Sequence, residues 1–116
     1  MKVCLSCDSI LTKMNEREYF HDLAGLATIR VRFTKDRGRI LWFVVQLEAF
    51  LNNDWYAISR YDTSHGFVHR DDIKPNGDQI KLPMSFSDNE TALNFAIEDF
   101  QINFMIFIER YKKWMR

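Results

Sequence analysis

The chain has 116 residues, of which 47% are hydrophobic and 15% aromatic, so it fits one globular domain with its own core. Its 16 basic and 16 acidic residues give a formal charge of zero, which excludes a global field that steers a protein toward nucleic acid or anionic lipid. Any anion site must therefore be local.

No segment reaches the roughly 20 apolar residues that cross a bilayer, and the start of the chain turns polar too soon for a secretory signal. We therefore expect a cytoplasmic protein without membrane contact. A single domain is expected over residues 1–116, with residues 1–14 as a loose N-terminal extension.

Cys4 and Cys7 form a CxxC pair at the amino terminus. A structural zinc site normally needs a second pair of ligands, and only His21 lies nearby. Zinc and a redox pair are both alternatives, but two reduced cysteines fit the pattern best. We therefore expect no metal site and no cofactor.

The first predicted elements are a short helix and a strand. The segment Asn15–Leu26 places a potential cap and early glutamates before apolar residues at helical spacing, which predicts a helix. From Ala27 to Lys35 apolar residues alternate with Arg30, Arg32 and Thr34, which predicts a strand with one buried face and one basic face.

The middle of the chain predicts a meander of antiparallel strands. Turn residues over Lys35–Gly38 precede the apolar run RILWFVVQLEAF, which is typical of a central strand. Asn tolerates positive φ, so Asn52 and Asn53 predict a hairpin turn before a strand over Trp55–Asp62. The aromatic residues around these turns fit core positions or cross-strand pairs better than base-stacking platforms: Trp42, Phe43, Trp55 and Tyr56.

A further hairpin is predicted between Phe67–Ile73 and Gln79–Leu82, because Pro75, Asn76 and Gly77 separate the two segments. Pro83 indicates that the last strand is short or lies at an edge. The sheet should therefore have four or five strands.

The clearest element is a long C-terminal helix. Ser87 and Glu90 have the spacing of a capping box. An apolar stripe at helical spacing follows: Leu93, Ala96, Phe100, Phe104, Phe107, Tyr111 and Trp114. Further apolar residues widen this surface and predict a homodimer or a bound partner: Ile102, Met105, Ile106 and Ile108. The expected fold class is α+β, with this helix packed on the sheet.

The segment RYDTSHGFVHRDDIK contains the densest cluster of reactive side chains. For metal-free RNA cleavage, His65 and His69 would share the acid and base roles, Asp62 would orient a histidine, and Tyr61 would donate a hydrogen bond. Phosphate would bind to basic residues of this segment and of the basic strand: Arg60, Arg70, Lys74, Arg30 and Arg32.

Two other interpretations of this segment stay open. His65 and His69 with a carboxylate of Asp62 or Asp71 form a usable divalent metal site. The same residue types also occur as ordinary turn residues and solvated ion pairs.

With RYDTSHGFVHRDD and the tail ALNFAIEDFQINFMIFIERYKKWM in view, the sequence resembles a small prokaryotic family similar to the TumE-like toxins of toxin–antitoxin pairs. The recognisable parts are the helix containing Glu98 and Asp99 and six residues before it: Arg60, Tyr61, Asp62, His65, His69 and Arg70. The resemblance implies a compact α+β toxin that acts on RNA and is neutralised by an antitoxin protein. It supplies no catalytic residues, so a non-catalytic interaction module is the rival class.

Overall fold

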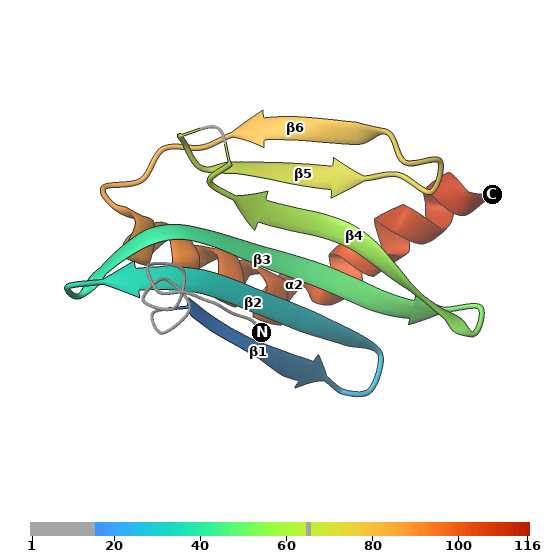
Figure 1. Cartoon of the computed structure of the whole chain (residues 1–116). Helices are drawn as coiled ribbons and strands as arrows, with labels where there is room; N and C mark the ends of the chain where they lie inside the picture. The colour runs from blue at the N-terminus through green and yellow to red at the C-terminus, as the bar shows by residue number, and fades with distance from the viewer. Residues whose placement is uncertain (1–15, 65) are drawn as a thin grey trace, which may run out of the picture.

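The computed structural model describes residues 16–64 and 66–116, which form one antiparallel sheet and one long helix (Figure 1). Residues 1–14, with Cys4 and Cys7, and also Asn15 and His65 lie outside the described residues. The elements in chain order are β1 (Glu16–Leu23), β2 (Ala27–Asp36), β3 (Arg39–Leu51), β4 (Asp54–Asp62), β5 (His69–Ile73), β6 (Gln79–Pro83) and α2 (Asn89–Met115).

The predicted α+β class, meander order and long C-terminal helix are confirmed. The sheet has six strands in the order β1-β2-β3-β4-β5-β6, each antiparallel to its neighbour, so the expectation of four or five strands was too low. The short β6 lies at the edge, as Pro83 indicated. Among the described residues, no helix is both long and apolar enough to cross a membrane.

The extra strand is the segment predicted as an N-terminal helix, and that prediction was wrong. Ala24 and Gly25 adopt φ of 56° and 72°, the conformation of a primed hairpin turn, and this turn folds β1 back onto β2. Pairing then runs over the whole strand, from Leu23 opposite Ala27 to Glu16 opposite Thr34. The helical spacing of the apolar residues was misleading, because β1 is an edge strand whose side chains are mostly exposed.

Two-residue turns close the next two hairpins, as predicted. Arg37 and Gly38 join β2 to β3, and Asn52 and Asn53 join β3 to β4; all four have positive φ. Such turns match the twist of paired strands, which explains why Asn and Gly stand there.

A β-bulge interrupts the pairing of β3 with β4. Leu47 lies opposite Ser59, whereas Glu48 lies opposite Ala57, so Ile58 is the extra residue. A bulge of this kind resets which face the following side chains reach. Trp55 and Arg60 therefore lie on the same face, although a regular strand would direct them to opposite faces.

The core lies between one face of the sheet and α2, which packs on β2, β3 and β4 (Figure 1). Alternate residues of β2 and β3 point into it: Ala27, Ile29, Val31, Phe43, Val45, Leu47 and Ala49. The helix contributes its predicted stripe: Leu93, Ala96, Phe100, Phe107 and Tyr111. Ile108 is also buried, which corrects its expected place on the outer surface, whereas Ile102, Met105 and Ile106 are exposed.

The helix begins one residue later than the capping box predicted. The N-cap is Asp88, whose carboxylate accepts a hydrogen bond of 2.8 Å from the backbone N–H of Thr91. Ser87 instead contacts the Thr91 hydroxyl through its own hydroxyl, at 3.4 Å. Hydrogen bonds from the Thr91 backbone and hydroxyl lower the pKa of Asp88 below its ordinary value.

We predict that Asp88→Ala lowers the melting temperature at neutral pH, because the capping hydrogen bond is lost. The ordinary pKa of an aspartate is about 3.9. Since the folded-state pKa is lower still, the ionised cap stabilises the fold above that ordinary value, and this stabilisation disappears as the pH falls through the folded-state pKa. Thermal melts at several pH values should show the wild-type and Asp88→Ala curves converging in acid. Ser87→Ala is the control, and an equal loss in that variant would contradict the assignment of the cap.

Candidate functional site

The charged segment that the sequence singled out falls on two paired strands, β4 and β5. Arg60 pairs with Asp71 and Asp62 with His69, while Tyr61 pairs with Arg70 between them. Because successive side chains of a strand point to opposite faces, the segment is divided between the two sides of the sheet. Tyr61 contacts Asp99 and Phe100 of α2, so Arg60, Asp62, His69 and Asp71 lie on the face that α2 does not cover.

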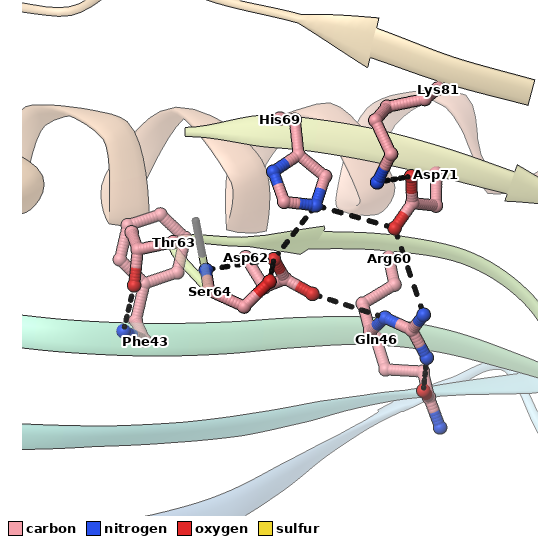
Figure 2. A network of polar contacts seen from close by, with 9 residues as sticks. All are labelled: Phe43, Gln46, Arg60, Asp62, Thr63, Ser64, His69, Asp71 and Lys81. Carbon is pink, nitrogen blue, oxygen red and sulfur yellow. Dashed lines mark hydrogen bonds and ion pairs between the residues drawn. The ribbon is translucent and has the colours of Figure 1, made fainter. Parts of the chain in front are cut away.

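On this uncovered face an ion-pair network surrounds His69 (Figure 2). The imidazole Nε2 lies 2.9 Å from Asp62 Oδ1 and 3.4 Å from Asp71 Oδ2. Arg60 bridges the same two carboxylates, with Nε 3.3 Å from Asp62 Oδ2 and a terminal nitrogen 3.6 Å from Asp71 Oδ2. From β6, Lys81 Nζ reaches Asp71 Oδ1 at 3.0 Å. Two carboxylates thus face two permanent cations and one imidazole.

Asp62 also organises the loop that follows β4. Its Oδ1 accepts a hydrogen bond of 3.1 Å from the backbone N–H of Ser64 and one of 3.0 Å from the Ser64 hydroxyl. These bonds hold the carboxylate in one orientation. Asp62 therefore combines a local structural role with its contact to His69.

The imidazole and the carboxylates of the network are largely buried, with side-chain exposures of 1% for His69 and 3% for Asp71, whereas the two cations reach solvent. Buried charges persist only when they are paired, and here the formal charges of the two carboxylates and of Arg60 and Lys81 cancel. The ligand atoms of Asp62, His69 and Asp71 lie within 4.8 Å of one another, a spacing that could hold a metal ion. Such an ion would have to displace Arg60 or Lys81, because both carboxylates already bind these cations.

Asp62 lies beside His69, but the imidazole is buried. The sequence interpretation made His69 the exposed acid or base and Asp62 its support. Instead, His69 lies behind Asp62, and the Asp62 carboxylate lines a hollow in the uncovered face. Among the described residues, the groups of this network within reach of a ligand in the hollow are therefore those of Asp62 and Arg60.

The hollow has a volume of about 380 Å³ and lies over β1 to β4. Its lining consists of Glu18, Arg30, Arg32, Val44, Gln46, Arg60 and Asp62. Register explains their meeting: Arg30, Gln46 and Arg60 form one cross-strand row, and the next row contains Glu18, Arg32, Val44 and Asp62. The fold thus brings three of the five predicted phosphate-binding residues together.

Neighbouring groups hold these arginines in place. Arg30 Nε donates to Glu48 Oε2 at 2.9 Å, and its guanidinium lies 5.1 Å from the Phe20 ring centre. The Arg32 guanidinium lies 5.5 Å from the centre of the Trp42 ring. Arg60 donates to Gln46 Oε1 at 3.5 Å. Each guanidinium group thus already contacts a neighbouring side chain.

The other predicted site residues lie elsewhere. Arg70 forms ion pairs with Asp72 at 3.1 Å and Asp99 at 3.6 Å, and the Tyr61 hydroxyl donates to Asp99 Oδ2 at 2.6 Å. Burial and the Asp99 hydrogen bond raise the pKa of Tyr61 well above its ordinary value, so its phenol is neutral at physiological pH. These groups join β4 and β5 to α2 beneath the sheet. Lys74 lies against the Trp114 ring near the end of α2, 5.6 Å from its centre.

Sequence reasoning missed four residues of the uncovered face: Glu18, Gln46, Glu48 and Lys81. Each lies on a predicted element, but a residue's neighbours across the sheet depend on register. Glu18 was also assigned to the wrong kind of element. The period of two in β2 and β3 did carry a signal, because it placed Arg30, Arg32, Gln46 and Glu48 away from the buried row.

Residues 14–116 match the model of a family described as a domain of unknown function, DUF7718. No curated protein and no solved structure matches the chain.

We predict that Asp71→Asn destabilises the fold by about 3 kcal/mol, because it leaves the buried network with an uncompensated positive charge. The charge of Lys81 should matter far less, since its side chain is 47% exposed, so Lys81→Met should cost no more than about 1 kcal/mol. Urea unfolding of the two variants measures the difference. Equal losses would contradict the central place of Asp71 in the network.

Proposed function

The chain belongs to the DUF7718 family, and we propose that its uncovered sheet face binds single-stranded RNA by its phosphate groups. One observation carries this proposal. Arg30, Arg32 and Arg60 come from β2 and β4, yet they line a single hollow of about 380 Å³.

Guanidinium groups suit this ligand. Each presents a planar fork of N–H donors that fits two phosphate oxygens, and its charge persists at every physiological pH. Glu18 and Asp62 also line the hollow, so three positive and two negative groups leave a formal charge of one. That balance fits a site that holds one phosphate by directed hydrogen bonds better than it fits a long basic track. The zero net charge of the chain agrees with this.

Two features support RNA as the source of the phosphate. The hollow lies over four neighbouring strands, on the face of the sheet that α2 does not cover (Figure 1). The resemblance to TumE-like toxins also implies RNA as the target. We therefore extend the proposal to a toxin-like role in the cytoplasm.

A toxin of this kind needs a neutralising partner. We propose that an antitoxin, or a second copy of the chain, covers the apolar residues that α2 exposes: Phe95, Ile102, Met105 and Ile106. Ile102 and Ile106 are 70% and 68% exposed, one turn apart on the same side of the helix. Covering them would remove an apolar surface from water.

We expect Arg32→Gln to weaken binding of a single-stranded RNA oligonucleotide by about tenfold or more, because a hydrogen bond to a charged group is lost. The salt dependence should fall as well, by a slope of about 0.7 for each phosphate contact removed. Fluorescence anisotropy at several salt concentrations measures both quantities.

Arg116→Gln is the matched control, since it removes the same charge from an exposed position at the end of the chain. If the two variants bind alike, or the wild type binds no RNA, the hollow is not a phosphate site for RNA.

RNA cleavage is the second candidate function, and the position of Asp62 favours it. Its carboxylate lines the hollow with the arginines and lies 2.9 Å from His69 Nε2. In the proposed reaction, Asp62 takes the proton of a ribose 2′-hydroxyl, and the 2′-oxygen forms a bond to phosphorus. The bond from phosphorus to the 5′-oxygen breaks, and the His65 imidazolium protonates this leaving oxygen. The arginines would stabilise the crowded phosphate, and the product is a 2′,3′-cyclic phosphate.

We predict that Asp62→Asn lowers cleavage by about 10² to 10⁴, the usual contribution of one proton-transfer group, while RNA still binds. His65→Ala should lower cleavage without changing the melting temperature. His69→Ala should in addition destabilise the fold, because its side chain is 1% exposed. Gel analysis of RNA with and without a 2′-hydroxyl at the scissile position measures the reaction. Full activity in Asp62→Asn, at unchanged stability, would exclude this mechanism.

A further inference from the structure

A second hollow lies on the uncovered face, beside the hollow lined by Arg30, Arg32 and Arg60, here called the arginine hollow. It has a volume of about 350 Å³ and is lined by Thr28, Arg30, Glu48 and Trp55. Arg30 lines both hollows. Along β3, the arginine hollow includes Gln46 and the second hollow includes Glu48, two residues further on. Same-face neighbours on a strand lie about 7 Å apart, so the two hollows are adjacent.

The aromatic wall of this second hollow is Trp55. Trp55 is 49% exposed, although its ring forms a cross-strand pair with that of Phe50, whose centre lies 5.3 Å away. A single exposed aromatic residue is ordinary on a protein surface. This one differs because it borders a hollow that contains a carboxylate and shares an arginine with the proposed phosphate site.

The ion pair between Arg30 and Glu48 separates the two hollows. Glu48 Oε2 accepts from Arg30 Nε at 2.9 Å and from the Gln46 side-chain amide at 2.7 Å. The Glu48 side chain is only 14% exposed, so these bonds fix both Arg30 and the floor of the second hollow. A cation, a fixed polar group and an aromatic ring thus follow one another across the face.

We infer that the second hollow is a nucleobase subsite, in which a base stacks on Trp55 while a phosphate of the same nucleotide lies among Arg30, Arg32 and Arg60. This inference rests on the proposed function and defines its substrate class. A base can stack on a protein side chain only when it has left its own helix, so the ligand is single-stranded and double-stranded RNA of the same sequence is excluded.

The test compares two ligands that share phosphate groups but not bases: a single-stranded RNA oligonucleotide and inorganic polyphosphate. Trp55→Ala should weaken RNA binding by about tenfold, the usual effect of losing one stacked base, and should leave polyphosphate binding unchanged. Trp55→Phe keeps an aromatic face and should restore most of the RNA affinity. Arg32→Gln should weaken the binding of both ligands. The exposed aromatic control on α2, Phe95→Ala, should weaken neither.

The outcomes separate this inference from the proposal beneath it. If Trp55→Ala binds RNA like the wild type while Arg32→Gln weakens both ligands, the base subsite is wrong and the phosphate site stands. Equal weakening of both ligands by Trp55→Ala also excludes stacking, because polyphosphate has no base. If the wild type binds neither ligand, both ideas fail. Duplex RNA that binds as tightly as the single strand would likewise exclude the subsite.

Discussion

The constraint on which the rest of the structure depends is the burial of charge between β4 and β5. Strand alternation directs Tyr61, Arg70 and Asp72 beneath α2 and directs Asp62 and His69 to the opposite face. Carboxylates in such places persist only beside cations, so each face needs its own set of partners. The set beneath α2 fastens the helix to the sheet. The other set holds Asp62 at the wall of the arginine hollow.

This division explains why most charged groups of this segment are paired within the fold. His69 and Asp71 are buried more completely than most residues of the core helix, and their charges are already compensated. Chemistry on this face therefore depends on groups that reach the surface, and Asp62 and Arg60 belong to both the buried network and the hollow. A ligand bound there would contact the buried ion pairs through Asp62 and Arg60.

Local signals in the sequence predicted the turns after β2, β3 and β5, the meander and the long helix, because Asn, Gly and apolar periodicity act over a few residues. The helix predicted over Asn15–Leu26 was wrong, because pairing with β2 outweighs a short helical pattern. The sequence predicted Arg30, Arg32, Arg60 and Asp62 as site residues, and the structure brings these four together. The sequence could not exclude Arg70 and Tyr61 from this site, because their place on the other face of the sheet depends on which strands pair and in what register. The sequence also could not predict which face of the sheet Trp55 lies on, because the bulge at Ile58 breaks the alternation of side chains along β4.

The bulge at Ile58 has a consequence for how this family could diversify. A substitution can change a side chain that lines the face, but it does not change which face of the sheet each position of β4 points to. Loss of a single codon within the bulge would rotate Trp55 toward the helix side while leaving Arg60 in place, and so would remove an aromatic group from beside the arginines without altering either residue. The number of residues in β4 can thus change which side chains face the hollow, even where every remaining residue stays the same.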